Sequence, residues 1–225
     1  MTNQVTIHRY IDHNTNVMII QNSISKEQLK QLPQVKYNGA IQVIQTKAAA
    51  IKALQYLNSQ SVLGIDSETR PAFVKGRSYK VALLQISSQE ICYLFRINKL
   101  GLIQELIDLL ENPNILKIGL SLKDDFMMLK KRAAFKQEGC IDLQDYVRPF
   151  GIKDRSLQKI YAILFKEKIS KAQRLSNWEA TELTDPQQKY AAIDAWSCVK
   201  IYNFLEDLKK TGNYEIAVTP EEETK

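Results

Sequence analysis

The sequence is poor in the residues that mark disulfide-rich, zinc-binding and membrane proteins. It has only three cysteines and two histidines, and Cys92, Cys140 and Cys198 lie far apart, without the spacing of a metal site. We expect these cysteines to be reduced core thiols and the protein to be cytoplasmic. The longest uninterrupted apolar run, Ile160 to Phe165, is far shorter than the roughly 20 residues that cross a bilayer. The N-terminal residues also lack a basic segment followed by an apolar one, so we expect neither a secretory signal nor a membrane partner.

Two glycine motifs that bind phosphates are absent as well. Neither G-x-G-x-x-G nor G-x-x-x-x-G-K-S/T occurs, which excludes the usual phosphate-cradling loops of nucleotide enzymes. The formal net charge of +6 weakly favours a polyanionic partner, because lysines and arginines gain affinity by displacing counterions from phosphates. Many basic proteins bind no nucleic acid, so this charge is informative only beside an independent site for phosphates.

Composition divides the chain into three parts. Residues 1–40 form an expected N-terminal extension, residues 41–211 show an α/β pattern, and residues 212–225 form an expected acidic, solvated tail. His8 and His13 lie in the extension, and we assign them no metal role.

Apolar runs and capping signals predict strands first and helices later. The expected strands are short and bounded by polar turns, and they cover residues 41–45, 62–66, 80–87, 90–95 and 115–120. The expected helices cover residues 46–57, 100–110, 124–133, 143–149, 156–165 and 184–210, besides a short helix that Ser25 opens and Pro33 closes. This order predicts a single α/β domain with a mixed central sheet flanked by helices.

Two carboxylates stand at the end of a predicted buried strand. Asp66 and Glu68 are two residues apart, so in a strand they point to the same face, with Cα atoms roughly 6–7 Å apart. Holding them together is costly unless a cation lies between them, and such oxygen ligands suit Mg²⁺ or Mn²⁺. Taken alone, the pair is explained better as a solvent-facing strand end, because an Asp-x-Glu triplet is common.

A second acidic position follows the predicted strand 115–120. Asp124 and Asp125 fall in the first turn of a predicted helix, where acids also complement the helix dipole and cap free amides. A metal ligand at this place would point across the top of the sheet toward Asp66.

Tyr190 and Asp194 form the third feature. They are four residues apart, so they share one face of a predicted helix whose other residues are mostly apolar or small. A buried acid in that setting needs a partner, which is either a cation of the site or a nearby lysine.

The order of these features is more specific than any one of them. The stretches that carry it are Leu63–Glu68, Lys80–Ile86, Gly119–Asp125, Ser176–Trp178 and Leu183–Ala195. In these stretches the chain resembles the DEDD exonuclease superfamily, in the branch with tyrosine in the last motif. It is most similar to Werner-type exonuclease domains, and more distantly to ribonuclease D and the proofreading domain of family A DNA polymerases. The resemblance spans about residues 41–209.

This resemblance implies a ribonuclease-H-like fold and 3′-5′ exonuclease activity with two Mg²⁺ or Mn²⁺ ions, releasing nucleoside 5′-monophosphates. It implies that Asp66 touches both ions, that Glu68 and Asp194 complete the ion holding the nucleophile, and that Asp125 supports the other ion. Tyr190 matches the residue that orients the attacking water; with an ordinary pKa near 10, a tyrosine suits orientation better than proton removal.

The resemblance has one departure. Werner-type proteins carry an aromatic residue after the acid pair, whereas this chain has Thr69. Basic residues near the motifs, Arg70, Arg77, Lys171 and Arg174, are the expected nucleic-acid contacts. We expect DNA ahead of RNA as the partner, and any helicase or repair partner to be a separate chain.

Three other readings remain open at this stage. A non-catalytic nucleic-acid-binding module on the same fold should have lost at least one of the four acids. A different nucleotide enzyme should carry one of the glycine motifs that are absent. An endonuclease of related fold is disfavoured by Tyr190 at its helical spacing from Asp194.

Overall fold

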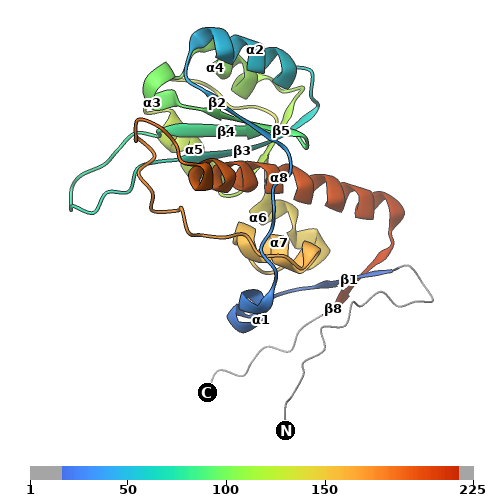
Figure 1. Cartoon of the computed structure of the whole chain (residues 1–225). Helices are drawn as coiled ribbons and strands as arrows, with labels where there is room; N and C mark the ends of the chain where they lie inside the picture. Colours follow the sequence, from blue (N-terminus) through green and yellow to red (C-terminus); the bar gives the residue numbers. More distant parts are fainter. Residues whose placement is uncertain (1–16, 218–225) are drawn as a thin grey trace.

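A six-stranded mixed sheet forms the centre of the structure, a computed structural model that describes residues 17–217. The strand order is β2-β5-β4-β3-β6-β7, in which β4 runs antiparallel to both of its neighbours and the other pairs are parallel. The strands are β2 (Ala40–Ile44), β3 (Val62–Glu68), β4 (Leu83–Ser87), β5 (Ile91–Phe95), β6 (Leu116–Gly119) and β7 (Cys140–Asp142). Helices cover both faces of this sheet (Figure 1), which confirms the expected fold class.

One face of the sheet is covered by four helices that bury an apolar core. These helices are α2 (Lys47–Leu57), α3 (Ile97–Leu100), α4 (Gln104–Glu111) and α5 (Leu122–Leu129). Alternate residues of the central strands, such as Leu63 and Ile65 on β3, point into this core and are fully or almost fully buried. Thr46 caps α2, since its hydroxyl accepts a hydrogen bond from the amide of Ala49 at 3.3 Å.

The long helix α8 (Asp185–Thr211) crosses the opposite face. Thr184 and Gln187 form a capping box at its start, and Gly212, with φ of 66°, ends it in the left-handed region. The helix lies very close to β3, because a Cβ atom on Gly64 would come within 1.9 Å of the Ala195 carbonyl oxygen. This close approach is what places residues of α8 beside the end of β3. Within residues 17–217, no helix is both long enough and apolar enough to cross a membrane.

A second apolar core lies between α8 and the elements at the lower end of Figure 1. These elements are α1 (Lys26–Gln31), α6 (Leu143–Tyr146), the 3-10 helix η1 (Arg148–Phe150), α7 (Leu157–Phe165), and the two-stranded parallel sheet of β1 (Met18–Gln21) and β8 (Tyr214–Ala217). Residues of the N-terminal segment, including Ile20 and Leu29, are buried in this core.

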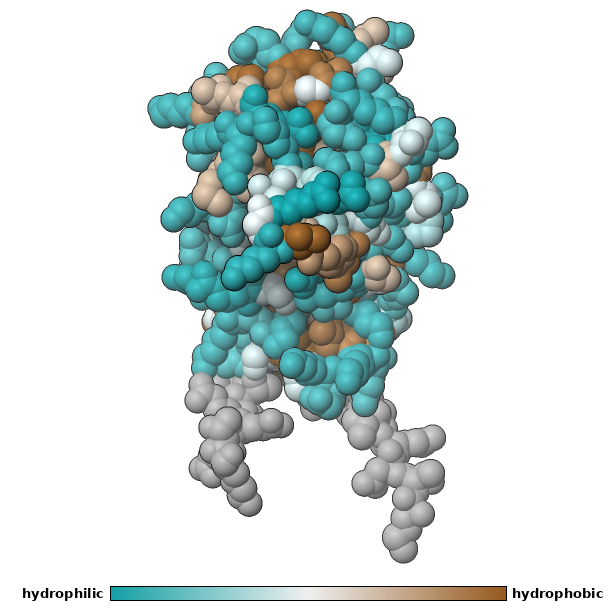
Figure 2. Space-filling model, turned by 90° about the vertical axis from the view of Figure 1, so that its left-hand side faces the viewer, coloured by the Kyte–Doolittle hydropathy of each residue, from teal (hydrophilic) through white to brown (hydrophobic). Residues whose placement is uncertain are grey.

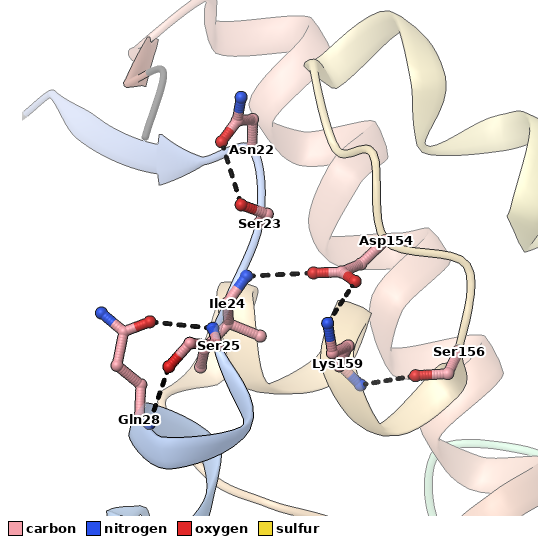
Figure 3. A network of polar contacts seen from close by, with 8 residues as sticks. All are labelled: Asn22, Ser23, Ile24, Ser25, Gln28, Asp154, Ser156 and Lys159. Carbon is pink, nitrogen blue, oxygen red and sulfur yellow. Dashed lines mark hydrogen bonds and ion pairs between the residues drawn. The ribbon is translucent and has the colours of Figure 1, made fainter. Parts of the chain in front are cut away.

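Polar contacts join the N-terminal segment to the residues around α7 (Figure 3). The carboxylate of Asp154 accepts hydrogen bonds from the backbone amide of Ile24 at 3.0 Å and from Lys159 Nζ at 2.7 Å. Further on, the amide of Val35 donates to the carbonyl of Lys168 at 3.0 Å. The segment is therefore fixed to the domain along most of its described length.

The structure differs from the expected organisation near the C-terminal end of the described residues. Residues 214–217, expected in a solvated tail, form β8, and the ring of Tyr214 packs against Phe150 at 5.5 Å between centroids. Residues 218–225 of the tail and residues 1–16, which include His8 and His13, lie outside the described residues. The division at residues 40 and 212 as domain boundaries stays a prediction.

Smaller differences concern element bounds. The expected helix 100–110 is divided into α3 and α4, because Gly101 adopts a φ of 78° between them. Helix α5 begins at Leu122 rather than at residue 124, and the three-residue strand β7 was not expected. A strand that short carries too little alternation to be recognised in a sequence.

Candidate active site

Three carboxylates converge where α8 passes the end of β3. Asp66 and Glu68 extend from the same face of β3, and Asp194 approaches them from α8. Each of the three offers an oxygen that lies within 4.8 Å of the others. Asp194 is 8% exposed, while Asp66 and Glu68 are half-buried. The two elements thus bring together acids that are far apart in the sequence.

The fourth acid, Asp125, reaches the group from α5. Strand β6 pairs only with the first half of β3, from Val62 to Gly64. Along its second half, which carries the acids, β3 therefore has no strand neighbour on the β6 edge, and α5 can approach there. The hydroxyl of Ser67 donates a hydrogen bond to the carboxylate of Asp125. Repulsion from Asp125 also contributes to the raised pKa of Asp66. Asp125 therefore lies beside the three converging acids.

The start of α5 is held by another carboxylate. Asp142 accepts hydrogen bonds from the amides of Ser121 at 3.1 Å and Leu122 at 2.9 Å. Ser121 has a φ of 57°, and this left-handed turn after β6 directs the chain into the helix. The contact orients the first turn of α5, from which Asp125 projects.

Burial raises the pKa of all four acids, and repulsion within the group adds to this for Asp66 and Glu68. Burial raises the pKa of Asp66 well above its ordinary value, with further contributions from the other three carboxylates. Burial, followed by Asp194 and Asp125, raises the pKa of Glu68 to about 9. Burial also raises the pKa of Asp194 to about 7 and that of Asp125 to about 6, against hydrogen bonds from Tyr190 and Ser67 that lower them. The group is thus under electrostatic strain in the absence of a cation.

Tyr190 lies one helical turn before Asp194 and donates a hydrogen bond to its carboxylate. Burial, followed by the charges of Asp194 and Glu68, raises the pKa of Tyr190 above its ordinary value. The phenol therefore stays protonated at neutral pH and acts as a hydrogen-bond donor. Its ring lies 6.0 Å from that of Trp178, which is fully buried.

The donor set fits a divalent cation. All of its ligands are carboxylate oxygens, which Mg²⁺ and Mn²⁺ prefer. Among residues 17–217, no lysine or arginine forms a salt bridge with any of the four acids. Bound cations would relieve the repulsion that raises these pKa values.

The four basic residues predicted to contact nucleic acid fall into two pairs. Lys171 and Arg174 line a cavity of about 220 Å³ together with Asp66, Tyr190 and Asp194. Arg174 also counteracts the raised pKa of Glu68, and Lys171 that of Asp194. This first pair therefore lies beside the acids.

The second pair lies on the loop between β3 and β4. The guanidinium groups of Arg70 and Arg77 lie 4.9 and 5.2 Å from the ring centroid of Tyr79, and neither residue lines the acidic cavity. Figure 2 views the side on which this loop protrudes, and this side is mainly hydrophilic with small hydrophobic areas. Contact of either pair with nucleic acid stays a prediction.

Ser67 is a site residue that the sequence analysis did not identify. It lies between the two acids of β3, so strand alternation directs it away from them and toward α5, the helix that carries Asp125. The alternation of side chains along the strand, together with the predicted position of Asp125 on the next helix, could have identified Ser67 from the sequence.

Comparisons with known proteins agree with this geometry. A protein-family model described as 3′-5′ exonuclease matches residues 41–209. A mouse protein, the bifunctional 3′-5′ exonuclease/ATP-dependent helicase WRN, is 33% identical over 162 residues, which are 69% of this chain and 12% of that protein. The exonuclease 3′-5′ domain-containing protein 2 of Drosophila melanogaster is 36% identical over 148 residues, which are 64% of this chain and 25% of that protein. The chain thus spans a quarter or less of the length of these two relatives.

Solved structures show the same fold. The EXO domain of Aedes aegypti Nibbler superposes with a TM-score of 0.70 at 20% identity, covering 82% of this chain and 95% of that one. Escherichia coli RNase D superposes with a TM-score of 0.65 at 20% identity, covering 76% of this chain and 45% of that one. These similarities confirm the ribonuclease-H-like fold class.

Proposed function

Because the chain belongs to the DEDD family of 3′-5′ exonucleases, we propose that it removes nucleotides from the 3′ end of a nucleic-acid strand by metal-assisted hydrolysis. The observation that carries this proposal is the convergence of Asp66, Glu68 and Asp194 within 4.8 Å, with Tyr190 on the same helix as Asp194. A purely structural role does not explain such a group, because clustered and partly buried carboxylates that form no salt bridge within residues 17–217 destabilise the fold.

Asp66, Glu68, Asp125 and Asp194 would hold two Mg²⁺ or Mn²⁺ ions. Such a pair activates water as a nucleophile, neutralises charge on the phosphate and stabilises the departing oxygen. The acids themselves fix the place where the phosphodiester reacts, and Ser67 fixes the orientation of Asp125.

The neighbouring side chains orient the reactants. Tyr190, held protonated by its surroundings, orients the attacking water through its hydroxyl group and does not remove a proton. Lys171 and Arg174, on the wall of the same cavity, bind the phosphate that is cut. The product of this reaction is a nucleoside 5′-monophosphate.

The substrate sugar and the partners belong to the same proposal. Trypanosoma brucei RNase D has been solved in complex with RNA U12, whereas the mouse relative combines its exonuclease with a helicase. Our prediction of DNA ahead of RNA, of a separate helicase or repair partner and of a cytoplasmic location therefore calls for direct tests.

Digestion of matched strands tests the activity. DNA and RNA oligonucleotides of one sequence, labelled at the 5′ end, are incubated with the protein in Mg²⁺, Mn²⁺ or EDTA. We expect a ladder of shortened products with the metals, no cutting in EDTA, and almost none with Asp194→Asn, whose fold should be retained. A single internal cut would indicate an endonuclease, a shifted band without cutting would indicate a binding module, and full activity of Asp194→Asn would refute the site.

A further inference from the structure

A second cavity adjoins the acidic one and is larger. The cavity around the acids holds about 220 Å³, whereas its neighbour holds about 600 Å³. Ile169, Ser170 and Tyr190 line both, so the two spaces meet at the proposed water-orienting tyrosine. Pockets for small ligands typically measure ~300–1,000 Å³, so the acidic cavity alone is small for a nucleotide and the neighbouring one is large enough.

One wall of the larger cavity comes from the segment Gln34–Asn38. This segment precedes residue 41, where the match to the exonuclease family begins. It is held firmly, because the amide of Val35 donates to the Lys168 carbonyl at 3.0 Å and Val35 is 4% exposed. The ring of Tyr37 packs edge-on against Trp196 at 5.5 Å between centroids. The cavity therefore has a fixed wall that the family motifs do not include.

The chemistry of the larger cavity suits one nucleotide of a strand. Its charged residues are Lys36, Lys189 and Asp185, all exposed, and within residues 17–217 neither lysine forms a salt bridge. Ile169 and the rings of Tyr37 and Tyr190 supply apolar surface for a base or sugar. Two unpaired cations beside an apolar wall match a phosphate attached to a nucleoside.

We propose that this cavity is a second subsite of the nuclease, which binds the nucleotide next to the one being removed. Lys36 and Lys189 bind the backbone phosphate of that nucleotide, and the Gln34–Asn38 segment forms the wall beside it. The N-terminal segment thereby contributes directly to the grip on a strand. This inference rests on the nuclease activity proposed above.

Strand length provides the test. The p-nitrophenyl ester of thymidine 5′-monophosphate offers one nucleotide to the acids and none to the second subsite, whereas an oligonucleotide offers both. For Lys36→Glu and Lys189→Glu we expect KM for a single-stranded oligonucleotide to rise about five- to tenfold at low salt, with kcat little changed. The kinetics of the ester should match those of the wild type.

Two further variants separate occupancy from general charge effects. Lys52→Glu makes the same charge change on α2, an exposed position on the opposite face of the sheet, and should leave KM for the oligonucleotide unchanged. Ala172→Trp fills the cavity without a change in charge at an exposed position and should raise that KM. Equal effects of Lys36→Glu and Lys52→Glu, or equal effects on ester and oligonucleotide, would overturn the subsite.

Fluorescence anisotropy of a labelled strand, in EDTA, keeps this test apart from the test of activity. Weaker binding by Lys36→Glu and Lys189→Glu than by Lys52→Glu supports the subsite whether or not the wild type cuts. Identical binding by all three variants overturns it. A wild-type protein that cuts neither substrate refutes the proposed function and leaves the anisotropy result to decide the subsite.

Discussion

The two faces of β3 have different roles although they alternate along one short strand. Leu63 and Ile65 point toward α2, α4 and α5 and are almost fully buried among apolar side chains. Gly64, Asp66 and Glu68 lie on the face of β3 toward α8. On this face, two of the residues are carboxylic acids and the third is a glycine. Alternation thus places the scaffold and the chemistry on the same seven residues, one face each.

The two faces of β3 contribute to the stability of the fold with opposite signs. The apolar face contributes burial free energy, while the carboxylates on the other face repel one another and raise each other's pKa. Substitutions on the two faces should therefore have opposite signatures in activity and stability.

The largest expected effect is that of Asp66→Asn. We expect activity to fall by more than the roughly 10–100-fold typical of residues that only support metal ligands. The melting temperature in EDTA at neutral pH should rise, because a half-buried carboxylate that is repelled by its neighbours is replaced by a neutral amide of the same shape. Digestion assays measure the activity, and calorimetry measures the melting temperature. A variant with reduced activity and a lower melting temperature would contradict the division between the faces.

Ile65→Ala, one residue away, should show the reverse pattern. Removing this buried side chain leaves a cavity in the apolar core and should lower the free energy of unfolding by about 2–5 kcal/mol. Urea unfolding measures this loss. Activity per folded molecule should stay close to that of the wild type, and a loss comparable to that of Asp66→Asn would show that the faces are not independent.

Gly64→Ala tests the contact between β3 and α8. The added methyl group would lie 1.9 Å from the Ala195 carbonyl oxygen, so α8 must shift, which should cost about 1–3 kcal/mol. Because Asp194 moves with α8, activity should fall as well, unlike in Ile65→Ala. Comparing kcat/KM with the urea midpoint for the two variants measures this difference. Unchanged activity in Gly64→Ala would argue against the view that the packing of α8 on β3 positions Asp194.

The smallest expected effect is a dependence of stability on pH. The folded pKa values of Asp194, about 7, and Glu68, about 9, lie above their ordinary values of 3.8 and 4.5, so the folded state binds more protons between these limits. The contribution of these groups is most favourable at low pH, and the melting temperature in EDTA should fall as pH rises from about 4 to 9. Mg²⁺ should reduce this fall, and Asp66→Asn should make it shallower. Equal pH dependence of the melting temperature in the wild type and in Asp66→Asn would refute the clustered carboxylates as its cause.

The residues named from the sequence for the candidate site lie near one another in the structure, and whether they form a catalytic site stays a prediction. Asp66, Glu68, Asp125, Tyr190 and Asp194 were named from spacing and resemblance, and the structure brings all five together. Their roles in catalysis remain predictions. The strand and helix that carry most of them are long or strongly patterned, so alternation and helical spacing identify their faces.

Contacts between distant segments could not be predicted in this way. Strand β8 lies in a stretch rich in acids, and only its pairing with β1 and the packing of Tyr214 on Phe150 make it a strand. Likewise, the wall formed by Gln34–Asn38 depends on its backbone contact with Lys168, which no local pattern encodes. Tertiary partners, not propensity, decide these segments.

The pairing of β1 with β8 has a consequence for how the molecule assembles. Its register joins Met18 to Tyr214, so the strand at one end of the described chain stays unpaired until the other end has been synthesised. Loop-closure entropy also makes such a long-range pairing a late event. During translation, β1 therefore cannot pair until almost the whole described chain, including α8, has been synthesised.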